Sequence, residues 1–233
     1  MTLSAMSKTG LLALAILLLV FLVIYCKRKP KVSPRRAPDI TPAPAWRLKE
    51  LLDQATRLQE EQKFDEVETL YGEVLEIRRK QAETNPAHEP DVAMTLNKMA
   101  NLYSDARQHE KAEAAYSEAL EIYRRRAKAG PEWQPYVART LSNFAAFCLL
   151  NRQNGRAGRM GDEAVNILRK CAKENPDGYG NDLAKTLLVL AYVFTEQTGR
   201  GEDIRVCAQE AERVAVDEDI KRKARKLIEK HKS

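Results

Sequence analysis

The sequence predicts an all-α protein in which an array of helical hairpins follows one N-terminal transmembrane helix. An uncharged apolar run occupies residues 10–26, and sequence blocks recur at intervals of about 45 residues beyond Trp46. No segment shows the alternation of apolar and polar residues that is typical of half-buried strands. The composition agrees, because charged residues make up 31% and aromatic residues only 6% of the 233 residues. This balance favours helices over aromatic-rich β architectures.

The net charge of +6 is concentrated near the N-terminus. Residues 1–36 contain seven basic and no acidic side chains, which leaves 32 basic and 33 acidic side chains in the rest of the chain. A nearly neutral domain lacks the electrostatic surplus that nucleic-acid binding requires. We therefore expect neither nucleic acid nor a small-molecule substrate as a partner.

Residues 10–26 are predicted to form a membrane anchor behind a short tail of residues 1–9. Seventeen helical residues span about 25 Å, the short end of what crosses a bilayer. A cleaved signal peptide would carry its positive charge before the apolar run and small residues just after it. Here one basic residue precedes the run and six follow it, namely Lys27, Arg28, Lys29, Lys31, Arg35 and Arg36. An uncleaved anchor is the better interpretation.

The same six membrane-proximal basic residues predict the orientation. Basic flanks stay on the cytoplasmic side, so we expect the N-terminus outside and residues 27–233 in the cytoplasm. A bacterial inner membrane and the outer membrane of an organelle fit equally well. Cys26 at the boundary is either a lipidation site or an interfacial residue without a role.

Residues 27–45 are predicted to be a basic, proline-rich linker. They contain five prolines and no hydrophobic periodicity. Such a segment is semi-rigid and would hold the following domain up to about 60 Å from the membrane.

Beyond the linker, two sequence blocks recur. The block 92–97 returns at 137–142 and at 183–188, and the block 70–79 returns at 115–124. Each unit predicts two amphipathic helices, with Pro- and Gly-containing breakers between units. One position is always small, which predicts a close approach of two helices; it holds Ala55, Ala100, Ala145 and Ala191.

These blocks resemble tetratricopeptide repeats, and in particular the long repeats of kinesin light chains. The matching segments are Pro90-Asp91-Val92-Ala93, Thr95-Leu96-Asn97-Lys98-Met99-Ala100, Leu102-Tyr103 and Lys111-Ala112-Glu113. The resemblance implies a right-handed superhelical array of about 3.5–4 repeats over residues 46–215, closed by a charged capping helix at 216–233. The glycines at 155, 158 and 161 interrupt the pattern, and we expect a mobile turn and a helix start there.

The resemblance also implies a concave groove that holds a protein or peptide partner. The groove-facing positions would be Lys98, Asn101, Arg139, Asn143, Lys185 and Tyr192. Amides at such positions bind a peptide backbone and cations bind carboxylates. We expect these groove-wall groups to be solvated in the free protein. Asn101, Asn143 and Lys185 match part of the carboxylate-clamp type of repeat, whose two further cations are absent here.

Signatures of catalysis and of cofactor or metal binding are missing from the sequence. The cysteines form no Cys-x-x-Cys pair, the three histidines are scattered, and the spaced glycines match no phosphate-binding loop. Cys148 and Cys207 lie on apolar stripes and are interpreted as core thiols. The sequence thus predicts no enzyme, no catalytic residue, no cofactor and no metal site.

Two function classes remain. The first is a single-pass membrane-anchored adaptor or scaffold that recruits a cytoplasmic partner through its groove. The second is a structural subunit packed permanently in a larger membrane complex, including an import-receptor-like role.

Overall fold

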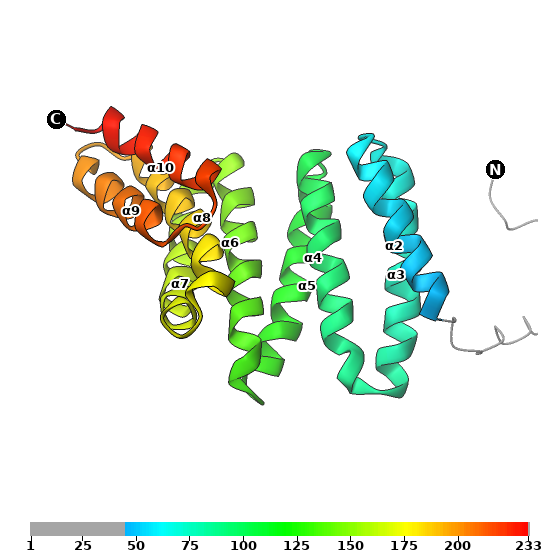
Figure 1. Ribbon diagram of the computed structural model, residues 1–233. Coiled ribbons are helices and arrows are strands. Elements are labelled where there is room, and N and C mark those ends of the chain that lie inside the picture. The colour runs from blue at the N-terminus through cyan, green and yellow to red at the C-terminus, as the bar shows by residue number, and fades with distance from the viewer. Residues whose placement is uncertain (1–44, 233) are drawn as a thin grey trace, which may run out of the picture. The chain divides into compact units, whose positions relative to one another are not determined.

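The computed structural model describes residues 45–232 of the chain (Figure 1). This part contains nine α-helices and no strand, which confirms the all-α prediction. The predicted tail, transmembrane helix and membrane-proximal basic residues lie outside the described residues, as does Cys26. Within residues 45–232, no helix combines the length and the apolar character that crossing a membrane requires.

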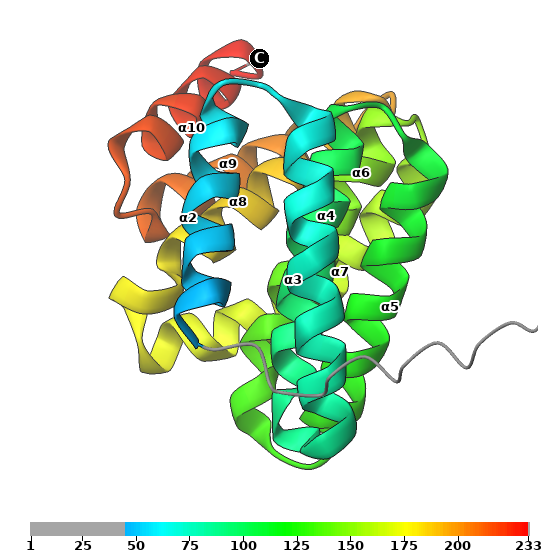
Figure 2. The same cartoon turned by 90° about the vertical axis from the view of Figure 1, so that its right-hand side faces the viewer.

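The helices follow one another as antiparallel hairpins. Each hairpin consists of a first and a second helix, and α10 (Glu218–Lys230) packs against the last of them. The hairpins are α2 (Ala45–Glu60) with α3 (Phe64–Thr84), α4 (Glu89–Asp105) with α5 (His109–Ala127), α6 (Gln134–Leu150) with α7 (Asn154–Glu174), and α8 (Pro176–Thr195) with α9 (Gly201–Val214). Figure 2 looks along the array from the α2–α3 end. Four hairpins and a terminal helix agree with the predicted repeat number.

The turn inside each of the first three hairpins has the same geometry. Gln62, Arg107 and Arg152 adopt positive φ angles of 58–59° and lie 45 residues apart. The next residue donates its backbone N–H to a carbonyl five residues earlier, as Gln108 does to Tyr103 at 2.8 Å. This bond is the mark of a Schellman ending, which satisfies a carbonyl at the helix terminus. The fourth hairpin turns through Gly199, with φ of 78°.

The four recurring alanines are completely buried, with 0% of their surface exposed. They lie in α2, α4, α6 and α8, the first helices of the hairpins. The apolar stripe predicted beside Ala100 is buried as well; its other members are Leu96, Met99 and Tyr103. The described residues belong to one compact unit, and these side chains form part of its buried core.

The glycine-rich segment differs from its prediction. It lies inside α7, which begins at Asn154, and the turn has already ended at Gln153. A Cβ atom on Gly161 would come within 2.6 Å of Leu190 Cδ2 in α8. The predicted helix start is therefore confirmed, whereas the predicted mobile turn is wrong, because Gly161 lies within α7 and permits its close packing on α8.

A buried arginine ties the first hairpin to the second. Arg78 in α3 is only 5% exposed, and its guanidinium donates to the Asp91 carbonyl (3.0 Å) and to Thr95 Oγ1 (2.6 Å). Burial lowers its pKa, an effect that the nearby Asp91 carboxylate opposes. One repeat later, the buried Tyr123 hydroxyl donates to the Pro90 carbonyl at 3.3 Å. All three bonds attach a second helix to the first half of α4.

Enlarging the small residue that recurs in each repeat should destabilise the array. Ala100→Leu places three extra carbon atoms where α4 meets its neighbours, and overpacking of this kind costs about 1–3 kcal/mol. The same substitution at Ala114, which is exposed on α5, should cost under about 0.5 kcal/mol. Urea denaturation of residues 42–233 measures both free energies of unfolding. Equal costs would show that the repeat register is wrong.

Candidate peptide-binding groove

The array bends so that the first helices lie on its inner side. Among the described helices, α4 contacts α6, α6 contacts α8, and α8 contacts α10. The second helices α3, α5, α7 and α9 make no comparable contacts with one another. The surface formed by α4, α6 and α8 is therefore the concave one, and we call it the groove.

All six predicted groove residues lie on these three helices. Lys98 and Asn101 belong to α4, Arg139 and Asn143 to α6, and Lys185 and Tyr192 to α8. Lys98, Arg139, Lys185 and Tyr192 are exposed, whereas the two asparagines are half-buried.

The six residues fall into three rows that run across the repeats. Arg139 and Lys185 are equivalent, as are Lys98 and Asn143, and Asn101 shares its row with Tyr192. Within one helix the rows are three or four residues apart, so they share one face. Three rows on three helices make nine positions, and the remaining three hold Met94, Ala146 and Val189. These nine positions hold three cations, two amides and no carboxylate.

The three groove cations have no carboxylate partner in the part of the chain that the structure describes. Within residues 45–232, none of Lys98, Arg139 and Lys185 lies within ion-pair distance of a carboxylate. The guanidinium of Arg139 lies over the ring of Tyr136, with its central carbon 5.1 Å from the ring centroid. Tyr136 in turn stacks on Tyr123 at 5.5 Å. The aromatic pair orients this cation but leaves its charge available.

Asn101 departs from the expectation of a solvated groove-wall amide. Its Oδ1 accepts a hydrogen bond from the Tyr116 hydroxyl at 2.5 Å, across the α4–α5 hairpin. Tyr116 is buried, and burial raises the pKa of its hydroxyl. Asn101 thus supports the fold as well as lining the groove. Asn97, in one of the two places where a clamp cation would stand, is buried and faces away from solvent.

A depression lined by both apolar and polar side chains lies where α6 and α8 end. Leu150 is 77% exposed and Tyr192 is 43% exposed. Both line a cavity of about 470 Å³ together with Leu149, Arg152, Asn154, Thr195 and Glu196. Tyr192 was predicted as a groove residue, whereas Leu150 was not, because its only signal in the sequence is an apolar residue at the end of a helix.

The outer surface is organised differently, because ion pairs connect successive second helices at the period of the repeat. Arg79 pairs with Glu118 at 2.6 Å, Arg124 with Glu163 at 2.7 Å, and Arg169 with Glu210 at 2.5 Å. A second set of ion pairs with the same period joins Lys111 to Glu68 and Arg156 to Glu113. Arg79, Arg124 and Arg169 recur within the repeated sequence block, but their pairing with carboxylates was not predicted.

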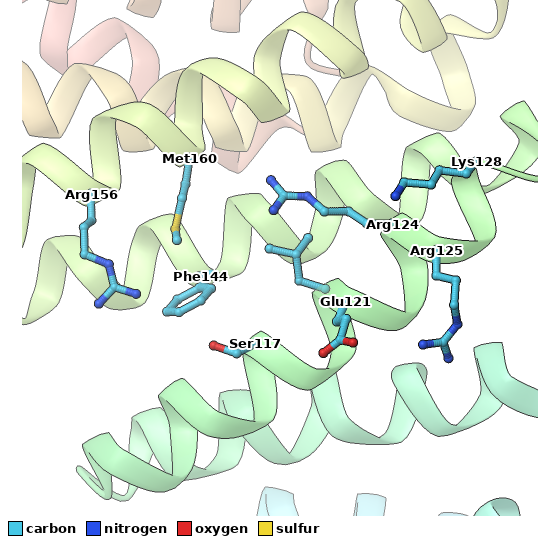
Figure 3. A pocket seen from close by; sticks show the side chains of 9 residues that line it. Ser117, Glu121, Arg124, Arg125, Lys128, Phe144, Arg156 and Met160 are labelled. Atoms are coloured by element: carbon cyan, nitrogen blue, oxygen red, sulfur yellow. The ribbon is translucent and has the colours of Figure 1, made fainter.

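A cleft of about 510 Å³ opens on this outer surface between α5 and α7 (Figure 3). Phe144 and Met160 form part of its apolar wall, and Lys128 and three arginines line it. Each of these arginines already has a carboxylate partner: Arg124 pairs with Glu163, Arg125 with Glu89, and Arg156 with Glu113. The cleft therefore offers an anionic partner less free charge than the groove does.

The described cysteines are poor nucleophiles. Burial raises the pKa of Cys148, Cys171 and Cys207, the last to about 11. These thiols stay protonated at neutral pH. Within residues 45–232, no group of three or more His, Cys, Asp or Glu side chains could hold a metal ion.

The two groove amides should differ in their effect on stability. Asn101→Ala leaves the buried Tyr116 hydroxyl without its acceptor, which should cost about 1–3 kcal/mol of unfolding free energy. Adding Tyr116→Phe removes the unpaired hydroxyl and should recover most of that loss. Asn143→Ala is the matched control and should cost under about 0.5 kcal/mol. If thermal and urea denaturation show no recovery in the double variant, the bond does not support the fold.

Comparisons with known proteins agree with this architecture. The tetratricopeptide repeat model matches residues 51–125 and 91–170. Among solved structures, BtubC (BKLC) from P. vanneervenii is similar, with a TM-score of 0.57 and 22% sequence identity. The alignment covers 72% of this chain and 62% of BtubC, so the chain spans less than two thirds of that protein's length. No curated protein matches the sequence. The family model covers more than half of the chain, and the chain belongs to the tetratricopeptide repeat family.

Proposed function

We propose that the protein is a single-pass membrane-anchored adaptor whose groove binds an acidic segment of a cytoplasmic protein. Repeats of this family suggest a scaffold role in protein–protein interaction. The observation that carries the proposal is the composition of the nine groove positions, which hold three cations, two amides and no carboxylate. In a chain with 33 acidic residues, nine positions on three successive helices that hold three cations and no carboxylate favour an anionic occupant.

The chemistry of the groove suits an extended peptide. Lys98, Arg139 and Lys185 come from three successive repeats and can each meet a carboxylate of a bound segment. Asn143 can bond the backbone of that segment, because its amide both donates and accepts. Leu150 and Tyr192 add apolar contact at the end of the groove where α6 and α8 terminate.

The anchor is proposed from the sequence. The uncharged run at residues 10–26 and the six basic residues after it support a transmembrane helix with the repeats in the cytoplasm. The proline-rich linker would hold the groove away from the bilayer, where a soluble partner can reach it.

Removing the groove charge should abolish partner binding. Residues 42–233 are immobilised, the proteins captured from the native host are identified, and the affinity of the main one is titrated. Changing Lys98, Arg139 and Lys185 to Gln should weaken it about 1,000-fold, since each lost charge-assisted bond contributes about 1.5 kcal/mol, roughly a factor of ten. The control changes Lys80, Lys128 and Lys170, exposed residues on the second helices and the turn after α5, to Gln. Equal losses in both variants would place binding outside the groove.

The orientation has its own test. A reporter fused after Ser233 should be active only if it works in the cytoplasm, because the positive flank follows the apolar run. Moving Lys27, Arg28, Lys29 and Lys31 in front of that run should weaken or invert the topology. Robust export of the reporter in the unaltered protein would overturn the proposed orientation.

A further inference from the structure

The terminal helix α10 concentrates positive charge that the groove does not use. Residues 221–232 contain seven basic side chains and one acidic side chain, Glu229. Basic clusters of this size on an amphipathic helix are typical of surfaces that meet anionic lipid.

The apolar face of α10 is already occupied. Ile220, Ala224 and Leu227 are buried, and the helix packs on α9 and contacts α8. This face cannot enter a bilayer without leaving the core. Any membrane contact through α10 must therefore be electrostatic and made by the folded protein.

Several bonds fix the orientation of α10. Asp217 caps its N-terminus by accepting from the backbone N–H groups of Asp219 (2.7 Å) and Ile220 (3.2 Å). Asn181 Oδ1 in α8 accepts from the N–H groups of Val216 and Asp217 in the preceding turn. The outward face of the helix is consequently preformed.

Three lysines on one exposed flank of that helix form a stripe. Lys223, Lys226 and Lys230 are exposed and spaced three and four residues apart, so they project from one side of the helix. Within residues 45–232 none of the three forms an ion pair. The remaining basic residues of the helix are paired, Lys221 with Glu218, Arg222 with Asp219, Arg225 with Glu212, and Lys232, just beyond the helix, with Glu229.

We propose that this lysine stripe docks on the anionic headgroups of a lipid bilayer. Lysine presents a compact, hydrated point charge, which suits a diffuse anionic surface. The stripe has no arginine fork to read base edges and no aromatic side chain on which bases could stack, so it lacks the means of base-specific nucleic-acid recognition. A second contact with the membrane would restrict how the repeats sit on the surface, independently of the groove.

Vesicle co-sedimentation of residues 42–233 tests the proposal, because this fragment carries the whole core and lacks the predicted anchor. It should bind phosphatidylcholine vesicles that contain phosphatidylserine and ignore vesicles of phosphatidylcholine alone. Changing the three lysines to Gln should weaken binding about 100-fold, since each cation near an anionic surface contributes roughly a factor of five. Raised salt should weaken the unaltered fragment in the same way.

Two matched variants separate the stripe from total charge. The first variant changes Lys223, Lys226 and Lys230 to Arg. It keeps the charge, and its affinity for anionic vesicles should be within a few-fold of that of the unaltered fragment. The second variant changes Lys98, Arg139 and Lys185 to Gln. It removes the same amount of charge from the groove and should leave vesicle binding unchanged. The stripe variant should in turn keep its affinity for the groove partner, so the two proposals can fail separately.

Three outcomes would overturn the assignment. The first is vesicle binding that survives the loss of the stripe, and the second is no binding to anionic vesicles at low salt. The third is binding to duplex DNA or to poly-glutamate at least as tight as binding to the vesicles, which would make the stripe a site for another polyanion. Circular dichroism of each variant checks that α10 remains folded.

Discussion

The close approach of helices at one small residue per repeat is the constraint on which the rest of the structure depends. Ala55, Ala100, Ala145 and Ala191 are fully buried, and each occupies the same place in a first helix. Their regular spacing stacks successive hairpins in nearly the same way. Where α7 meets α8 the constraint is tighter still, because Gly161 leaves room for Leu190.

Stacking of this kind separates the two surfaces of the array. The first helices contact one another from α4 onward, whereas the described second helices stand apart and are joined through ion pairs such as Arg124–Glu163. Charges on the outer surface are thus used partly to connect repeats. On the inner surface, the described groove cations do not connect repeats through ion pairs, and they remain available to a partner. Exposed ion pairs contribute little stability each, so the buried alanine contacts outweigh them.

Much of the fold could be predicted, because a period of 45 residues and an apolar stripe report directly on helix packing. The groove rows could be predicted from the family pattern. Other features depend on partners that periodicity does not reveal. The bond between Asn101 and Tyr116, the buried guanidinium of Arg78, and the place of Gly161 inside α7 each require the position of a neighbouring helix. Asn101 was therefore expected to be solvated, although it accepts a bond from a buried hydroxyl.

Site-specific photo-crosslinking tests most directly whether the inner surface is the binding surface. A benzophenone amino acid is placed at Tyr192, which is exposed on α8 in the groove, or at Glu121, which is exposed on the outer helix α5. The two variants are irradiated with the captured partner at equal concentrations. If the groove is the binding surface, position 192 should give a crosslinked product and position 121 little or none. Efficient crosslinking from position 121 with none from position 192 would contradict it.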